Sequence, residues 1–551
     1  MALSCSWAIM HWKMKKTNNP TNENRILKNK WYLYLTEFFS GMSVMAAELG
    51  ASRLLAPYFS SSQIVWTIII GTIMIAMALG NLYGGRSADQ SPDPDKLYGR
   101  MLVAAVWIAA IPFLGKLVIL LVSALLIVSV STNFLIWAAF LSCMIVFVYP
   151  LFLLGTVTPS LVKYAVGSLD DSGRTVGKLG AANTIGSIIG TFVPTFLTIP
   201  AVGTAATFVI FSGILLLLGI VYFLSERRGA VKVIVSAVLF AAASAAAFLL
   251  GFAFWDNTLT LEDESVYNYL QVREDDKRVV LSTNVLFGVQ SVYEKNDTLT
   301  GMYYDYALAA PMMLDEPQTA HDMLILGMGT GTYATQCRRY FDSMDIAGVE
   351  IDEKITALAH DYFALDPDIP VTTYDGRAFL AGTDRKYDVI MVDAYQDITI
   401  PFQMSTQEFF KTVQSHLTEN GVMVVNMNMT SNRTDGINAY LQDTIASVFD
   451  TVYTVDVPNC TNRELFASQN PDIAEKLGQN ITAAADPELM QMMQLASIKL
   501  QPCGGGDRIL TDDKAPVELL GMRAIDDMIR SELAYYKEKF LTEGISGIIS
   551  G

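Results

Sequence analysis

Glycines and acidic residues in the second half of the chain have the spacing of a nucleoside site. The apolar run 323–326 leads into the turn GMGTG, whose glycines are Gly327, Gly329 and Gly331. A later apolar segment ends at Glu350, 19 residues after Gly331. Glycines let the backbone approach a ligand closely, and an acid about 20 residues further on accepts hydrogen bonds from a ribose. The pattern therefore predicts that this region binds a nucleoside.

Two further acids refine the kind of ligand. Asp375 precedes Gly376 in YDGRAF, and Asp393 ends the run YDVIMVD. We expect Glu350 to accept from the ribose hydroxyls and Asp375 to reach the adenine. Such a group of acidic residues suits a sulfonium or an amine better than a pyrophosphate. An S-adenosyl-type ligand therefore fits better than NAD. Two structural alternatives stay open: Asp375 as the N-cap of helix 376–381, and Glu350 as the acceptor for a loop amide.

Alternating strands and helices would position these residues. The sequence predicts strands at 323–327, 346–350, 371–375, 389–393 and 422–427, and helices at 333–341, 353–363, 376–381, 406–417 and 435–448. A final pair, VYTVDV and ELFASQ, is typical of an antiparallel hairpin. This order predicts a mostly parallel, Rossmann-like α/β sheet that binds ligands at the carboxyl ends of its strands.

The first half of the chain differs sharply in composition. Residues 1–254 hold 17 Lys+Arg against 9 Asp+Glu, whereas residues 255–551 hold 21 against 46. Apolar runs long enough to cross a bilayer predict an α-helical membrane bundle of about seven spans. The predicted spans are 31–50, 64–84, 101–123, 133–156, 179–199, 204–224 and 233–254. We therefore expect four parts: a basic cytoplasmic tail (1–30), a transmembrane bundle (31–254), a small β-subdomain (255–315) and a Rossmann-like catalytic domain (316–551).

Loop charges predict the orientation of the bundle. Lys and Arg cluster in the N-terminal tail and in alternate loops, which favours a cytoplasmic N-terminus in the cell membrane. Seven spans would then place the catalytic domain outside the cytoplasm, although S-adenosyl donors are made inside it. Glu37, Glu48 and Lys116 fall within predicted spans, where an ionisable side chain by default suggests function.

Composition also excludes some partners. The acidic second half disfavours nucleic acid, because phosphates would be repelled. Five scattered cysteines without a CxxC pair, and only four histidines, predict no metal site. Cys460 and Cys503 lie in loop-like sequence, where they would form a disulfide in an oxidising compartment or remain free thiols.

From about residue 267 to 466 the sequence resembles the spermidine synthase family. GMGTG, VEID, YDGRAF and YDVIMVDAY stand where that family has its nucleoside motifs, and ELGASRLLAPYF, QDITIPFQMSTQEFF and ILTDDKAPVE resemble its membrane-fused branch. The resemblance implies a fold of the S-adenosylmethionine-dependent methyltransferase type. It also implies transfer of an aminopropyl group from decarboxylated S-adenosylmethionine to a small amine, with release of methylthioadenosine and no permanently bound cofactor. The expected partners are this amine, the lipid bilayer and a second copy of the chain.

The same resemblance assigns roles to single residues. Asp393 matches the acid that deprotonates the attacking amine. Gln290 matches a residue of the donor site, while Tyr304 and Asp305 match residues of the acceptor site. Asp397 lies near the second acidic position of the family, although VDAYQD is spaced one residue wider.

Two departures from the family keep other functions open. Thr330 replaces an acid inside the glycine turn, and Tyr303-Tyr304-Asp305 replaces Tyr-His-Glu. Both changes touch the region expected to recognise the aminopropyl and diamine groups. An S-adenosylmethionine-dependent methyltransferase acting on a small molecule is therefore one alternative. A polyamine transporter whose second half serves as a non-catalytic sensor is the other.

Overall fold

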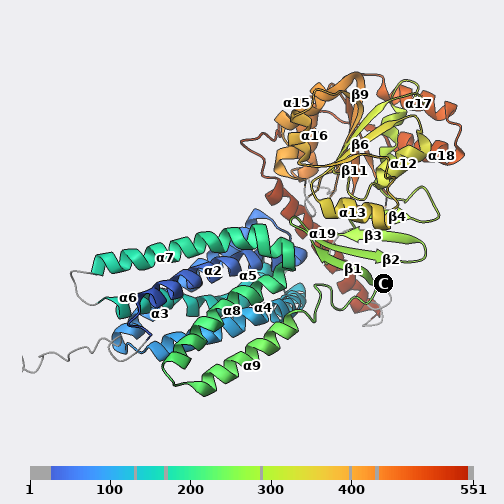
Figure 1. Cartoon of the computed structure of the whole chain (residues 1–551). Coiled ribbons are helices and arrows are strands. Elements are labelled where there is room, and N and C mark those ends of the chain that lie inside the picture. Colours follow the sequence, from blue (N-terminus) through green and yellow to red (C-terminus); the bar gives the residue numbers. More distant parts are fainter. Residues whose placement is uncertain are drawn as a thin grey trace, which may run out of the picture. The chain divides into compact units, whose positions relative to one another are not determined.

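The computed structural model describes residues 26–129, 133–166, 172–285, 289–395, 400–428, 434–458 and 460–543 (Figure 1). They form two compact units. The first unit takes in the described residues up to Leu55, then Trp66–Ser123 and Ala138–Gly251. The second takes in Ala56–Val65, Ala124–Trp137 and the described residues from Phe252 onward.

The described residues up to Ala247 are almost entirely helical. The elements are α2 (Lys30–Phe59), α3 (Gln63–Gln90), α4 (Pro94–Ser129), α5 (Phe134–Gly155), α6 (Val157–Ala165), α7 (Ser172–Val193), the π-helix η2 (Pro194–Thr198), α8 (Ile199–Ser225) and α9 (Ala230–Ala247). Among the described residues, five helices are long and apolar enough to cross a membrane, namely Gln63–Gln90, Pro94–Leu126, Phe134–Ala165, Ser172–Ser225 and Ala230–Ala247.

The count of seven spans is not confirmed. The first predicted span lies in α2, which is not among the five helices and carries Glu37, Glu48 and Arg53. The fifth and sixth predicted spans both fall in the 54-residue segment Ser172–Ser225. Its backbone leaves the helical conformation at Gly203, with φ 82° and ψ 173°, so a kink lies between the two predicted spans. The number of crossings stays a prediction.

Two charged groups inside the first unit, Glu37 and Lys116, have polar partners. Glu37 is fully buried and accepts hydrogen bonds from the Thr158 hydroxyl at 2.5 Å and the Asn183 amide at 3.0 Å. The Lys116 ammonium donates to the Leu250 carbonyl at 2.6 Å. These contacts join α2 to α6 and α7, and α4 to the segment after α9, because a buried charge needs such partners.

The second unit begins with a small antiparallel sheet. Its strands are β1 (Leu259–Glu264), β2 (Tyr269–Glu274), β3 (Arg278–Ser282) and β4 (Ser291–Glu294), in that order. Apolar residues of β2 and β3 pack against Ile355, Leu358 and Phe363, which lie in or next to α13 (Glu353–Tyr362). Two short helices follow the sheet, α10 (Tyr303–Ala307) and α11 (Ala309–Met312). The boundaries predicted for a separate β-subdomain stay a prediction.

An eight-stranded sheet forms the centre of the second unit, in the order β12-β10-β11-β9-β8-β5-β6-β7. Its strands are β5 (Asp322–Leu326), β6 (Asp345–Glu350), β7 (Val371–Thr373), β8 (Tyr387–Val392), β9 (Leu417–Met427), β10 (Thr451–Asp456), β11 (Arg463–Ser468) and β12 (Gln501–Pro502). Strands β5 to β9 are parallel, whereas β10 and β11 form the expected antiparallel hairpin. The predicted mostly parallel α/β sheet is thus confirmed.

Helices cover both faces of this sheet (Figure 1). One face packs against α10, α11, α12 (Thr332–Tyr340), α17 (Ile473–Ala483) and α18 (Pro487–Lys499). The other packs against α14 (Gly376–Ala381), α15 (Gln407–His416), α16 (Ile437–Ala446) and the start of α19 (Val517–Glu543). The predicted helices match α12 to α16, while α17, α18 and α19 have no counterpart among the predictions. Strand order reverses between β5 and β8, and such a switch point is where open α/β sheets bind their ligands.

Candidate functional site

The glycine turn lies at this switch point. Its backbone conformation and its close packing both require glycine. Gly327, Gly329 and Gly331 all have positive φ, at 86°, 54° and 79°. A Cβ on Gly327 would come within 2.5 Å of the carbonyl oxygen of Asp393, at the end of the neighbouring strand β8. A Cβ on Gly331 would come equally close to Leu365. The turn therefore needs glycine both for its conformation and for its contact with β8.

Glu350 holds the turn from the adjacent strand β6. Its carboxylate accepts the N–H of Gly329 at 2.9 Å and the N–H of Asp352 at 3.0 Å. Burial raises the pKa of Glu350 above its usual value, while these two hydrogen bonds lower it. The loop-amide role anticipated for Glu350 is thus present. Each oxygen keeps a second lone pair, so the contact with Gly329 does not exclude a ribose.

Asp375 adopts its alternative role as well. Its side chain caps α14 by accepting the N–H of Ala378 at 2.8 Å. The preceding residue, Tyr374, donates its N–H to the Glu350 carbonyl at 3.1 Å, which keeps the two acids on neighbouring strand ends. A Cβ on Gly376 would lie 3.6 Å from Cβ of Leu326, at the end of β5. Asp375 and Gly376 therefore belong to the same edge as the glycine turn.

Asp393 is held at the end of β8 by two neutral donors. The Tyr303 hydroxyl donates to its Oδ2 at 2.6 Å, and the Asn426 amide donates to its Oδ1 at 2.8 Å. Burial of the carboxyl raises the pKa of Asp393 from 3.8 to about 7, with a further contribution from the negative charge of Glu350 and opposition from the two hydrogen bonds. A carboxyl that titrates near neutral pH is suited to accept a proton during catalysis.

Two of the three tyrosines of α10, Tyr303 and Tyr304, form hydrogen bonds with different partners. The rings of Tyr303 and Tyr304 lie 4.0 Å apart between centroids, and Tyr304 donates to the backbone carbonyl of Gln290 at 3.1 Å. Tyr303 belongs to the same run as the predicted substrate-binding residues Tyr304 and Asp305, and it contacts Asp393 directly. The structure thus brings Gln290, Tyr304 and Asp393 together through α10.

Asp305 forms its side-chain hydrogen bonds with Thr300, Gly301 and Gln336, and none with Asp393. It is 2% exposed and accepts hydrogen bonds from both the N–H and the hydroxyl of Thr300, from Gly301 N–H and from the Gln336 amide. Burial raises its pKa, while these donors lower it. With both oxygens occupied, Asp305 orders the loop before α10. Its predicted contact with substrate stays a prediction.

Asp397 and Thr330 are the remaining positions that the sequence analysis named near this site. Asp397 lies outside the described residues. Thr330 is 1% exposed, and its hydroxyl lies 3.3 Å from that of Thr332, which in turn donates to the Val292 carbonyl. The turn therefore carries a buried hydroxyl at the position where the related family has an acid.

Three polar residues of this site were not anticipated from the sequence. Asn426 contacts Asp393, and the Asn462 amide donates to Asn426 at 2.8 Å. Glu464 on β11 lies directly opposite Asn426 on β9 and is fully buried, and its two carboxyl oxygens form no hydrogen bond with any described residue. Burial, together with the charge of Asp393, raises the pKa of Glu464. The sequence did contain a signal for two of them, because Asn426 is a polar residue inside the apolar run VVNM and Glu464 adjoins the apolar run of ELFAS.

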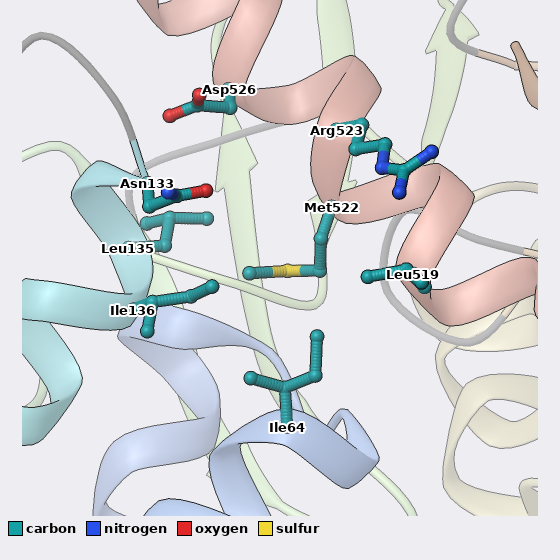
Figure 2. A pocket seen from close by; sticks show the side chains of 8 residues that line it. All are labelled: Ile64, Asn133, Leu135, Ile136, Leu519, Met522, Arg523 and Asp526. Carbon is teal, nitrogen blue, oxygen red and sulfur yellow. The ribbon is translucent and has the colours of Figure 1, made fainter.

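A separate cavity of the second unit plays no part in this site. It has a volume of about 220 Å³ and is lined by Ile64, Asn133, Leu135, Ile136, Leu519, Met522, Arg523 and Asp526 (Figure 2). None of the predicted site residues lines it. Asp526 of α19 instead accepts the N–H of Phe134 at 3.2 Å, at the first residue of α5. The cavity therefore borders helix ends rather than the carboxyl edge of the sheet.

Comparison with known proteins gives consistent matches. The profile of the spermine/spermidine synthase domain matches residues 302–469. A probable polyamine aminopropyl transferase of Bifidobacterium longum is 52% identical over 347 residues, which are 60% of this chain and 77% of that protein. A polyamine aminopropyltransferase of Vibrio vulnificus is 26% identical over 286 residues, covering 49% of this chain and 93% of its own length. A crystal structure of a probable spermidine synthase from Corynebacterium glutamicum is 17% identical, covers 45% of this chain and 96% of its own, and has a TM-score of 0.34.

Proposed function

Because this chain belongs to the polyamine aminopropyltransferase family and is a transferase, we propose that Asp393 is the base that activates its acceptor amine. The donor would be decarboxylated S-adenosylmethionine. Asp393 removes a proton from the amine, whose nitrogen lone pair attacks the aminopropyl carbon next to the sulfonium. The carbon–sulfur bond breaks, its electron pair stays on sulfur, and methylthioadenosine leaves. The position of Asp393 between Tyr303 and Asn426, with a pKa of about 7, is the observation that supports this role.

The raised pKa decides whether Asp393 is a useful base. An alkylammonium has a pKa of about 10, so an ordinary Asp near 3.8 would be too weak by about six units. A pKa of about 7 reduces that difference to about three units. Asp393 also carries no positively charged partner among the described residues, so a cationic substrate is a matching ligand for this edge.

The donor would lie along the turn and the neighbouring strand ends. We propose that Gly327, Gly329 and Gly331 allow its close approach, that Glu350 accepts from the ribose, and that Asp375 lies beside the adenine. The cap and loop hydrogen bonds of the two acids hold them in place for these contacts. On the acceptor side we propose Tyr304 and Asp397, the latter outside the described residues, and beside the donor we propose Gln290.

The direct experiment is an assay of the purified full chain in detergent with decarboxylated S-adenosylmethionine and a series of diamines. Methylthioadenosine should be released in step with the aminopropylated amine. Asp393→Asn should lose most of its activity at every pH, and Asp384→Asn, at an exposed position, is the matched control. No product from the wild-type chain with any amine would overturn the proposal.

One observation favours a second candidate, methyl transfer from S-adenosylmethionine itself. Thr330 leaves no acid inside the turn to bind the amino end of a decarboxylated donor. Calorimetric titration with the two donors separates the candidates. Tighter binding of the decarboxylated form supports aminopropyl transfer, and tighter binding of the carboxylated form supports methyl transfer.

We further propose that the helical half anchors the enzyme in the cell membrane with a cytoplasmic N-terminus. The five apolar helices support this location. Cys460 and Cys503 are free thiols in the structure, but burial raises the pKa of both and would slow their labelling. The exposed Ser343→Cys, in a chain whose five natural cysteines are changed to serine, is therefore the better reporter. Labelling by an impermeant maleimide in intact cells would place the catalytic domain outside; labelling only after lysis would place it inside.

A further inference from the structure

A groove in the first unit lies between three apolar helices and has a basic mouth. It has a volume of about 480 Å³ and is formed by the start of α4, the end of α5 and the start of α9. Its lining residues are Asp95, Lys96, Gly99, Arg100, Leu102, Val103, Tyr149, Leu153, Lys232, Val235 and Ser236. Since α4 and α9 begin where α5 ends, all the charged residues lie at one end of these helices.

Three cations of the groove have no acidic partner. Among the residues that the structure describes, Lys96, Arg100 and Lys232 form no ion pair. Arg100 donates to the Ser87 hydroxyl at 2.9 Å, and Lys96 lies 3.4 Å from the Ser91 hydroxyl. Arg100 also lies 5.0 Å from the centre of the Tyr83 ring, and Lys232 lies 5.5 Å from that of Phe223, so the partners of the three cations are neutral groups.

The acid in the groove is already neutralised. Asp95 accepts from Arg228 at 2.8 Å and from the Tyr222 hydroxyl at 2.6 Å. The Lys232 ammonium extends over Gly99, where it would lie 4.0 Å from an added Cβ. The groove therefore presents three positive charges around a floor that has no side chain at Gly99.

The wall beyond the charges is apolar. Leu102, Val103, Leu153 and Val235 continue the groove along the helices, and Tyr149 stands half-exposed beside them. A free inorganic anion gains nothing from such a wall. A phospholipid uses both parts, because its phosphate needs cations and its acyl chains need an apolar surface.

From this arrangement we propose that the groove binds the headgroup of an anionic phospholipid, with the phosphate among Lys96, Arg100 and Lys232 and an acyl chain against Val103 and Val235. This inference rests on the proposed membrane location. Basic pockets between membrane helices on the cytoplasmic side are a known means of holding anionic headgroups. The loop charges predict that this end of α4, α5 and α9 faces the cytoplasm.

The test uses the full chain in nanodiscs of phosphatidylcholine with a small fraction of phosphatidylglycerol. Native mass spectrometry counts the phosphatidylglycerol molecules that stay bound after release. The triple variant Lys96→Gln, Arg100→Gln, Lys232→Gln should bind this lipid on the order of 100-fold more weakly, at about fivefold for each cation near a membrane surface. The matched control removes three exposed cations elsewhere, Lys28→Gln, Arg174→Gln and Lys178→Gln, and should bind like the wild type.

A second variant tests the groove independently, in case the triple variant misfolds. Gly99→Leu changes no charge, and its Cβ would have only the Lys232 ammonium within 4 Å. Its side chain should fill the floor and also displace phosphatidylglycerol. Equal lipid retention in the wild type, the triple variant and Gly99→Leu would overturn the proposal. Displacement of the lipid by millimolar inorganic phosphate would also overturn it, in favour of a soluble anion.

Failure of this inference is distinguishable from failure of the proposed function. Alkaline carbonate extraction tests membrane integration without reference to any lipid, and methylthioadenosine release tests the transferase. A chain that stays in the membrane and is active, yet binds phosphatidylglycerol no better than phosphatidylcholine, contradicts the lipid site alone.

Discussion

The two edges of the eight-stranded sheet treat their acidic residues in opposite ways. At the amino ends of the strands, Arg385 pairs with Asp322 at 2.7 Å and with Asp345 at 2.6 Å, and His321 lies 3.3 Å from Asp388. At the carboxyl ends, no cation among the described residues pairs with Asp393 or Glu350. The hydrogen bond from His321 holds the pKa of Asp388 at about 2, whereas burial lifts that of Asp393 to about 7.

The difference separates stabilising acids from acids that remain available to a ligand. A paired carboxylate stabilises the fold above its pKa, while an unpaired and partly buried one costs free energy until a cation or a proton arrives. The proposed substrates are an amine and a sulfonium. The carboxyl edge is therefore suited to positively charged reactants, and each edge makes its own predictions.

The largest expected effect is on catalysis. Asp393→Asn should lower kcat by about 1000-fold, within the range for loss of a general base. The amide keeps the shape of the side chain, so the melting temperature should not fall. Product formation is followed by chromatography of methylthioadenosine. Retention of more than a tenth of wild-type kcat would exclude Asp393 as the base.

The opposite edge should respond in stability instead. Asp388→Asn should cost about 2 kcal/mol at pH 7, because the pKa of Asp388 lies about two units below its value in an unfolded chain. A lowered pKa means that this stabilisation is present above about pH 4 and is lost as the pH falls towards 2. Thermal unfolding in detergent at pH 7 and pH 3 measures the difference between variant and wild type. A kcat loss comparable with that of Asp393→Asn would contradict the distinction between the edges.

A smaller effect concerns the pH dependence of the reaction. The wild-type kcat/KM should fall as the pH drops through about 7, because a protonated Asp393 cannot accept the substrate proton. Tyr303→Phe removes a hydrogen bond that lowers this pKa, so the acid limb should move to higher pH, with about tenfold less activity at pH 7 and recovery near pH 9. Tyr304→Phe is the control for the limb, since its hydroxyl donates to Gln290. An unmoved limb in Tyr303→Phe would show that another group titrates there.

The smallest effect is expected at Glu464. Its raised pKa means that the folded state loses stability relative to the unfolded chain as the pH rises above about 4.5. Glu464→Gln resembles the protonated acid and does not titrate, so it should be more stable than the wild type by about 1 kcal/mol at pH 8 and equal to it at pH 4. Thermal unfolding at the two pH values checks this. Lower stability of the variant at pH 8 would mean that the carboxylate has a cationic partner.

The sequence predicted the parallel strands of the sheet because its local signals agreed with one another. Glycine turns, apolar runs and terminal acids repeat from 322 to 427, and they predicted the parallel strands and the edge where Gly327, Glu350, Asp375 and Asp393 meet. The side chains of Glu350 and Asp375 were harder to predict. Each takes part in a loop or cap hydrogen bond in the structure, since a carboxylate with four acceptor sites can serve both backbone and ligand.

Contacts between distant segments were beyond the sequence patterns. Asn426 and Glu464 face Asp393 only because β9 and β11 pair in one register, which no local motif encodes. Asp305 resembles a substrate residue by motif, yet Gln336, 31 positions later, donates to it at 2.6 Å. The number of spans also depended on tertiary structure, since only the backbone shows the break at Gly203.

The contact between Gly327 and the carbonyl of Asp393 has a consequence for how such an enzyme can change. The turn proposed to approach the donor and the strand end proposed to carry the base pack closely, since the Asp393 N–H donates to the Leu326 carbonyl at 2.9 Å and a Cβ on Gly327 would lie 2.5 Å from the Asp393 carbonyl oxygen. Leaving group and base would be preorganised relative to each other before either substrate arrives. Selection for a new amine would then act on α10 and the loops around it, and the acceptor could diversify while the reaction stayed the same.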